Sequence, residues 1–182
     1  NIRVVFGVEP LSMSSNSKGV ELETNQGLIK SVNCIIATNG FAKQWIEDDI
    51  QPARAQVIVT NEIENLQVKG TFHYQKGYYY FRNIGNRILL GGGRNLDFKG
   101  ETTESFETTP QIQQKLEDLM RSTIIPNQNF KIEYSWSGIM GVGDTKSPIL
   151  KMLNKNTAIG VRLGGMGVAL GSQVGKSLAN YF

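Results

Sequence analysis

The sequence predicts an α+β fold, built mainly on antiparallel or mixed β-sheet with a few helices. Short β-type segments bounded by turn residues outnumber the helical segments over the 182 residues. Few helices lie between consecutive strands, which separates this pattern from the alternating strand and helix order of a parallel sheet. The length favours one domain or slightly more than one, and it allows a sizeable core to be buried.

The first third of the chain predicts short strands separated by turns. Three segments have the composition of strands: residues 2–9, 19–24 and 28–31. Residues 32–38 form a nearly continuous apolar run that ends at Asn39-Gly40, which favours a strand buried on both faces. Residues 41–48 predict a short helix that ends before Pro52.

The middle of the chain predicts a long strand followed by a hairpin. Residues 54–63 have the apolar, β-branched composition of the long strand. Residues 77–84 and 87–90 flank Gly85-Asn86, which is suited to a two-residue hairpin turn. Residues 91–106 are expected to be a loop.

The best-defined helix follows that loop. Thr109 is a candidate N-cap, and Pro110 occupies the first helical position. The apolar side chains that follow recur at helical spacing up to Pro126: Ile112, Leu116, Leu119, Met120 and Ile124.

The last third returns to strands and ends in a helix. Residues 130–139 alternate as a strand, which places Ile132, Tyr134 and Trp136 on one face. Residues 158–161 predict a short strand, and a final helix is expected to begin near Gly165.

The composition is that of an ordinary globular protein, with 40% apolar and 19% charged residues. The net charge is +3 and the basic residues are scattered, which gives little support to nucleic-acid binding. The single cysteine, Cys34, lies in an apolar run and is expected to be a buried structural thiol in a reducing, cytoplasmic compartment. No apolar segment approaches the length of a membrane span. Since the sequence begins at Asn1, inside a strand-like pattern, we expect a piece of a longer protein.

Side chains that could carry out catalysis are scarce. The only histidine, His73, has no serine or cysteine partner in a recognisable motif and is expected to be structural. No spacing of Cys, His, Asp and Glu suggests a metal site, and no phosphate-binding glycine motif follows a strand. Asp144 is interpreted as a turn former and Arg82 as a solvent-exposed strand charge. We therefore predict no catalytic side chain and no metal, and expect any reactivity to come from a bound cofactor.

A glycine cluster at residues 164–167 lies between the last predicted strand and the final helix. The first N–H groups of a helix have no partner within the helix and carry partial positive charge. Glycines at this point let a flat or anionic group approach the backbone closely. The sequence therefore predicts a docking edge at the start of the last helix.

Five short motifs in a fixed order resemble the D-amino-acid oxidase and glycine oxidase family of FAD-dependent oxidoreductases. They are Ala37-Thr38-x-Gly40, Pro52-x-Arg54-x-Gln56, Tyr78-x-x-x-Arg82 leading into Leu90-Gly91-Gly92, Trp136-x-Gly138, and Gly164-Gly165-x-Gly167-Val168. Each motif alone is weak, but their order and spacing match over essentially the whole chain.

This resemblance implies a domain organisation. Residues 1–50 would be the end of a Rossmann-like FAD-binding domain, and residues 51–140 a substrate domain. Residues 141–182 would return to the FAD domain with a helix that contacts the flavin. The family's N-terminal Gly-x-Gly-x-x-Gly is absent here, so the chain resembles the C-terminal half. FAD is expected in the intact protein and not, as a tight ligand, on this chain alone.

The resemblance also implies a set of cofactor-binding residues. Val8 matches a position at the adenine end of FAD, and Ala37, Thr38 and Gly40 match a turn that lines the dinucleotide. The start of the last helix matches the segment that faces the pyrimidine edge of the flavin: Gly165, Met166, Gly167 and Val168.

The implied substrate site differs from the family pattern at one position. Tyr78 matches a tyrosine that reaches the substrate. On a strand Tyr78 and Tyr80 share one face and Tyr79 and Phe81 the other, and one of these faces is expected to be core, so Tyr78 lines either a site or the core. Relatives that act on amino acids carry an arginine two residues after Trp-x-Gly, and here Met140 replaces it. We expect that Arg94 or Arg162 supplies the cation instead, or that the substrate is not a simple amino acid.

The resulting expectation is an enzyme that oxidises an amine or amino-acid-like small molecule by hydride transfer to flavin. Two alternatives stay open: a non-catalytic binding or interaction module, and the flavin domain of an enzyme that modifies transfer RNA. The scattered charge argues against the RNA alternative. The sequence leaves the oligomeric state and the electron acceptor open.

Overall fold

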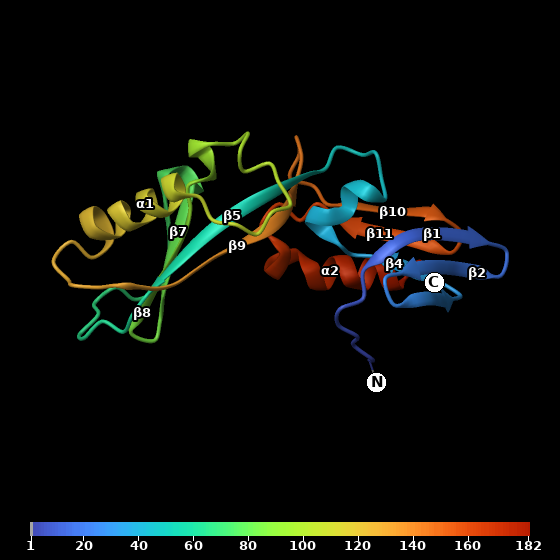
Figure 1. Ribbon diagram of the computed structural model, residues 1–182, viewed down its shortest axis with the longest axis horizontal. Coiled ribbons are helices and arrows are strands. Elements are labelled where there is room, and N and C mark those ends of the chain that lie inside the picture. Colours follow the sequence, from blue (N-terminus) through green and yellow to red (C-terminus); the bar gives the residue numbers. More distant parts are fainter. Residues whose placement is uncertain (1) are drawn as a thin grey trace.

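Two lobes joined by a pair of long strands make up the computed structural model, which describes residues 2–182 (Figure 1). The long strands are β5 (Gln51–Thr60) and β9 (Ile132–Val142), which pair antiparallel along most of their length. Figure 1 shows both chain ends in the lobe that contains α2. The mixed α and β content, with mostly antiparallel sheets and few helices, confirms the predicted fold class.

The larger lobe is a five-stranded antiparallel sheet in the order β6-β7-β8-β5-β9. The strands not yet described are β6 (Thr71–Tyr74), β7 (Tyr79–Ile84) and β8 (Arg87–Gly92). Helix α1 (Pro110–Leu119) covers one face of this sheet, and a core lies between them (Figure 1). Fully buried members of this core include Ile58, Tyr79, Leu90, Ile112 and Leu116.

The smaller lobe contains two three-stranded sheets. The first is an antiparallel meander of β1 (Pro10–Asn16), β2 (Gly19–Thr24) and β3 (Gly27–Ser31). The second has the order β10-β11-β4, formed by β10 (Ile149–Asn154), β11 (Thr157–Val161) and β4 (Cys34–Ile36). Helix α2 (Gly167–Ala179) packs on β11, where Gly160 leaves room for the side chain of Leu178.

The predicted helix and hairpin are confirmed. All five apolar side chains predicted on one helix face are buried, although the last turn, Met120–Ile124, is a π-helix. Thr109 holds the N-cap position without capping through its side chain, because its hydroxyl accepts a hydrogen bond from Gln56 Nε2 at 2.8 Å. Gly85 and Asn86 form the turn between β7 and β8.

Three predictions near the start of the chain are wrong. Residues 2–9 form no strand, because pairing with β2 begins only at Pro10. The predicted strand at 32–38 is reduced to β4, an edge strand on which Val32 is 70% and Ile35 44% exposed, so it is not buried on both faces. The predicted helix at 41–48 is a 3-10 helix, η1 (Asn39–Gln44).

The structure also contains strands that were not predicted from the sequence, and these form through hydrogen bonds to a neighbouring strand. Strands β6 and β10 were not predicted, and each is held by an antiparallel partner, β7 and β11 respectively. The predicted loop at 91–106 contains the end of β8 and a 3-10 turn, η3 (Arg94–Leu96).

Cys34 is half-buried rather than buried, and this partial burial raises the pKa of its thiol. Within residues 2–182, no helix has the length and apolar character to cross a membrane.

Candidate active site

A cavity of about 500 Å³ lies between the larger sheet and the glycine turn that precedes α2. It brings together five of the residues predicted from the sequence: Tyr78, Arg94, Met140, Gly165 and Met166. The first three were predicted to bind substrate and the last two to contact the flavin. Positions that are far apart in the sequence therefore share one cavity.

The face of the larger sheet opposite α1 forms one wall of this cavity. Tyr79 points into the core, so its neighbour Tyr80 points to the other face and lines the cavity. Tyr80 lies across Gly91 of β8, where a Cβ would come within 2.6 Å of the tyrosine ring. Burial raises the pKa of Tyr80, so its hydroxyl stays protonated at neutral pH and can donate a hydrogen bond.

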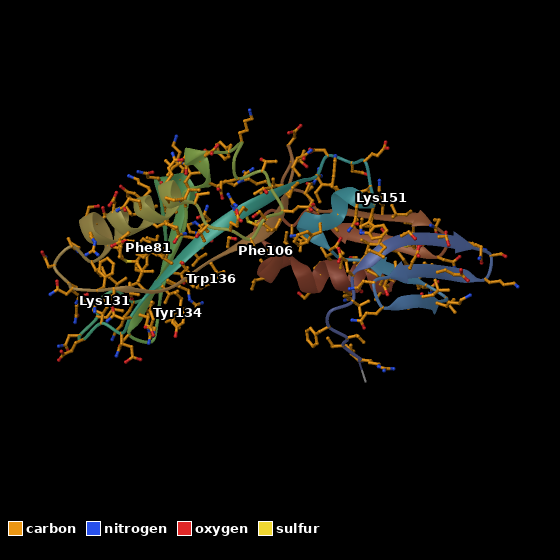
Figure 2. The ribbon with its side chains drawn as sticks, in the orientation of Figure 1. Phe81, Phe106, Lys131, Tyr134, Trp136 and Lys151 are labelled. Atoms are coloured by element: carbon orange, nitrogen blue, oxygen red, sulfur yellow. The ribbon has the colours of Figure 1, made fainter. Side chains whose placement is uncertain are left out.

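The same face of the sheet continues along β9 beyond the cavity, and there its side chains are exposed. Trp136 and Tyr134 lie on it, and Figure 2 shows both on the side of the β5–β9 pair away from α1. Trp136 does not line the cavity. The Trp136-x-Gly138 motif therefore does not line the cavity, whereas Met140, two residues further along the strand, does.

A glycine-rich exit from β8 places Arg94. Gly92 and Gly93 both have left-handed backbone, with φ of +127° and +80°, and a side chain at Gly92 would overlap the Tyr78 carbonyl. The Gly93 N–H donates to the Tyr78 carbonyl oxygen at 3.0 Å. Together these contacts turn the chain into η3, which begins with Arg94 beside Tyr78.

Arg94 is the half-buried cation of the cavity. Its guanidinium carbon lies 5.0 Å from the centre of the Phe98 ring, and that ring makes an edge contact with Tyr78 at 6.4 Å. The Arg94 Nε is buried and has no hydrogen-bond partner in the described part of the chain. Burial lowers the pKa of Arg94, but an arginine remains protonated in any case. A buried donor of this kind calls for an acceptor, and a planar guanidinium suits a carboxylate.

The turn before α2 forms the opposite side of the cavity. Gly164 and Gly165 have left-handed backbone, with φ of +55° and +83°, and the Gly164 N–H donates to the Gly141 carbonyl at 3.0 Å. The first bonds of α2 run from the N–H groups of residues 169 and 170 to the Met166 carbonyl. The N–H groups of Gly167 and Val168 therefore precede the helical ladder. Val168 is fully exposed, so this helix start is open to a ligand.

Arg162 lies outside the cavity, although it was predicted as a substrate-binding cation. Its side chain is only 12% exposed, and the guanidinium is engaged by hydrogen bonds: Nη1 donates to the Asp49 carbonyl at 2.7 Å, Nη2 to Thr145 Oγ1 at 3.0 Å, and Nε to the Ser147 carbonyl at 3.0 Å. An ion pair with Asp49 Oδ2 at 3.0 Å completes the set. This side chain fixes the loop between β9 and β10 through these bonds, and it does not line the cavity.

The other predicted cofactor residues lie around a second hollow or beside it. Val8 and Thr38 line a hollow of about 470 Å³, and Thr38 Oγ1 is buried with no partner among residues 2–182. Ala37 is exposed and does not line the hollow. A Cβ at Gly40 would come within 2.7 Å of Ile139 Cγ2, so this glycine is needed for packing of η1 on β9.

Sequence reasoning assigned no site role to several other residues that line the cavity, among them Tyr80, His73, Phe98, Lys76 and Lys146. His73, expected to be structural, is exposed on β6, and Phe98 contributes the ring beside Arg94. Lys76 comes from the 3-10 turn η2 (Gln75–Gly77), and Lys146 from the β9–β10 loop. No local sequence signal marks the two lysines, since each lies in a turn far from the other. The described residues contain no group of three or more potential metal ligands.

Comparison with known proteins extends this picture. A family model described as FAD dependent oxidoreductase (DAO) matches residues 1–181. A search of curated proteins found no match. Solved structures with a similar fold include L-proline dehydrogenase from P. horikoshii, with a TM-score of 0.74 and 17% identity over 94% of this chain and 48% of that one.

Two further structures have a similar fold. Glycine oxidase from Geobacillus kaustophilus has a TM-score of 0.76 and 18% identity, covering 96% of this chain and 47% of that one. Iminodiacetate oxidase from Chelativorans sp. BNC1 has a TM-score of 0.72 and 18% identity, covering 93% and 47%. The chain thus spans about half the length of these structures, and at such identities the likeness concerns the fold.

Proposed function

We propose a function for this chain, which belongs to the DAO family of FAD-dependent oxidoreductases. The proposed activity is the oxidation of an amine or amino-acid-like substrate by a protein that binds FAD against this chain. One observation carries the proposal: a single cavity has an open glycine turn on one side and Arg94 with Tyr78 on the other. The names of the structurally similar proteins, which include a glycine oxidase and a proline dehydrogenase, agree with it.

The residues present fit a flavin. Gly164 has no atom within 4 Å of where a Cβ would be, and the next glycine also lacks a side chain, so a flat ring could approach the backbone. In this proposal residues 165–168 hold the pyrimidine edge through backbone N–H groups. Val8 and the Thr38 hydroxyl, which has no hydrogen-bond partner in the described part of the chain, hold the distant part of the dinucleotide, beside Ala37. Gly40 contributes indirectly, by fixing this turn on β9.

When bound, the flavin supplies the acceptor for a hydride from the substrate carbon. The chain's own residues bind and orient the substrate. Arg94 pairs with a carboxylate, the Tyr78 and Tyr80 hydroxyls can donate hydrogen bonds, and Phe98 and Met140 exclude water. If the amine arrives neutral, no side chain of this chain is required as a base.

Flavin content and turnover test this function. The protein should be purified together with the nucleotide-binding segment that the family requires, and examined for visible flavin absorbance and for oxidation of amino acids. We expect a yellow protein that reduces a dye or oxygen with at least one amine substrate. A colourless, FAD-free protein would refute the proposal.

A pair of variants tests the assignment of Arg94. Loss of a charged hydrogen bond costs about 1.5–3 kcal/mol, so Arg94→Met should raise KM for a carboxylate substrate roughly 10- to 150-fold. Arg82→Met is the matched control, because Arg82 lies exposed on β7 in the same lobe and does not line the cavity. Equal effects of the two substitutions, with flavin content unchanged, would remove Arg94 from the substrate site.

A further inference from the structure

We infer that the substrate of this cavity carries two negative charges, as an amine with two carboxylates. This inference rests on the proposed function and names its substrate class. Among the residues that the structure describes, three cationic side chains line the cavity, Arg94, Lys76 and Lys146, whereas no aspartate or glutamate lines it. One carboxylate needs only one guanidinium. The two lysines are therefore in excess of what a simple amino acid requires.

The three cations have no carboxylate partner of their own, although the charge of Glu101, which is paired with Arg54, also acts on Arg94. None of them makes an ion pair within residues 2–182, in contrast to the paired Arg54, Lys151 and Arg162. The whole chain has a net charge of only +3, so the concentration of positive charge around one cavity is local. Unpaired like charges around a concave surface focus the potential and attract an anion.

Lys146 is held at the cavity by the contacts of Arg162. The hydrogen bonds of Arg162 to Thr145 Oγ1 and to the Ser147 carbonyl engage the residues on both sides of Lys146. The Asp144 N–H also donates to Asp49 Oδ2 at 2.7 Å, which ties the same loop to the segment before β5. Arg162 is therefore a positioning residue for Lys146.

Lys76 is held by unusual backbone. Gln75, Lys76 and Gly77 all have positive φ, at +49°, +58° and +89°, and positive φ is uncommon for residues other than glycine. The Tyr78 N–H closes this turn by donating to the Gln75 carbonyl at 3.1 Å. The turn thus places Lys76 next to the tyrosine that contacts the Phe98 ring.

The chemistry of the three cations divides the ligand into two ends. Arg94 is half-buried against an aromatic ring and suits a planar carboxylate near the reacting carbon. Lys76 and Lys146 are exposed and lie at the rim of the cavity. Their ammonium groups are compact point charges, which suit a second carboxylate at the end of the substrate away from the reacting carbon. An exposed lysine contributes little to binding on its own, and the two together should contribute about tenfold.

Equilibrium binding to the FAD-loaded protein tests this inference without turnover. The probes are glutarate, butyrate and 4-phosphonobutyrate, titrated by calorimetry. We expect glutarate to bind at least tenfold more tightly than butyrate and no less tightly than the phosphonate. Equal affinities for glutarate and butyrate would overturn the inference, and a tighter phosphonate would overturn the assignment of a carboxylate.

Lysine variants test which side chains cause the preference for glutarate over butyrate. Lys76→Gln combined with Lys146→Gln should abolish the preference for glutarate and leave butyrate affinity within about twofold. Lys115→Gln combined with Lys155→Gln is the control, because both lysines are exposed and neither lies at the cavity. A preference that survives the first pair refutes the role of these lysines. Selective glutarate binding without oxidation of any amine would instead count against the proposed function alone.

Discussion

Replacement of Glu101 by alanine is expected to destabilise the larger lobe by about 3–5 kcal/mol. Glu101 is 1% exposed, and its carboxylate accepts hydrogen bonds from Arg54 Nε at 2.9 Å, Arg54 Nη2 at 2.7 Å and Gln56 Nε2 at 3.0 Å. These contacts join β5 to the loop that carries Phe98 into the cavity. The Pro-x-Arg-x-Gln motif thus supports the site from behind the sheet.

The magnitude follows from what the substitution leaves behind. Without Glu101, Arg54, a residue that is 5% exposed, stays buried without its counter-ion, and removal of one partner of a buried pair costs about 3–5 kcal/mol. Gln56 also loses one acceptor but keeps Thr109 Oγ1 at 2.8 Å. The backbone bond from the Arg54 N–H to the Glu101 carbonyl does not depend on the side chain. Such a loss is a large fraction of the 5–15 kcal/mol typical of a folded domain.

Denaturant unfolding followed by tryptophan fluorescence measures this change. Trp136 reports on the larger lobe and Trp45 on the smaller one, so Trp45→Phe isolates the relevant signal. The exposed Glu64 gives the control, Glu64→Ala, which should change stability by less than about 0.5 kcal/mol. Arg54→Met with Glu101→Leu removes both charges and should recover most of the loss. A cost below about 1 kcal/mol for Glu101→Ala would refute this account of the pair.

Three further predictions concern other parts of the fold. Gly91→Val should displace the Tyr80 ring and raise the KM for substrate, together with a loss of about 1–3 kcal/mol in thermal unfolding; an unchanged KM would show that Tyr80 does not contact the substrate. The ion pair with Lys151 lowers the pKa of Asp48 from 3.8, so it stabilises the fold above that pH and is lost as the pH falls through the lower folded value. Asp48→Asn should therefore flatten the acid limb of a pH–stability curve, and an unaltered limb would contradict this. Because burial raises the pKa of Cys34, a maleimide should label it more slowly at neutral pH than a cysteine in a short peptide; equal rates would show that its burial has no effect on reactivity.

Much of the fold was predictable from local sequence. The helix from Pro110 was found because its apolar side chains recur at the helical period, and the β7–β8 hairpin because Gly85-Asn86 suits a tight turn. Strand β6 was missed because its side chains are all exposed and its partner β7 holds it. The strand predicted at residues 2–9 was wrong because apolar composition alone does not supply a partner strand.

The sequence by itself determined the α+β class, the order of the family motifs and the glycine turn before the last helix, because these depend on residues close together in the chain. Only the tertiary structure decided which cations reach the cavity. Arg94 lines it, whereas Arg162 is engaged by Asp49 and by the loop that carries Lys146. That choice depends on contacts between residues up to 113 positions apart, which no local pattern encodes. The cavity exists because the long β5–β9 pair and the turn before α2 bring such distant segments together.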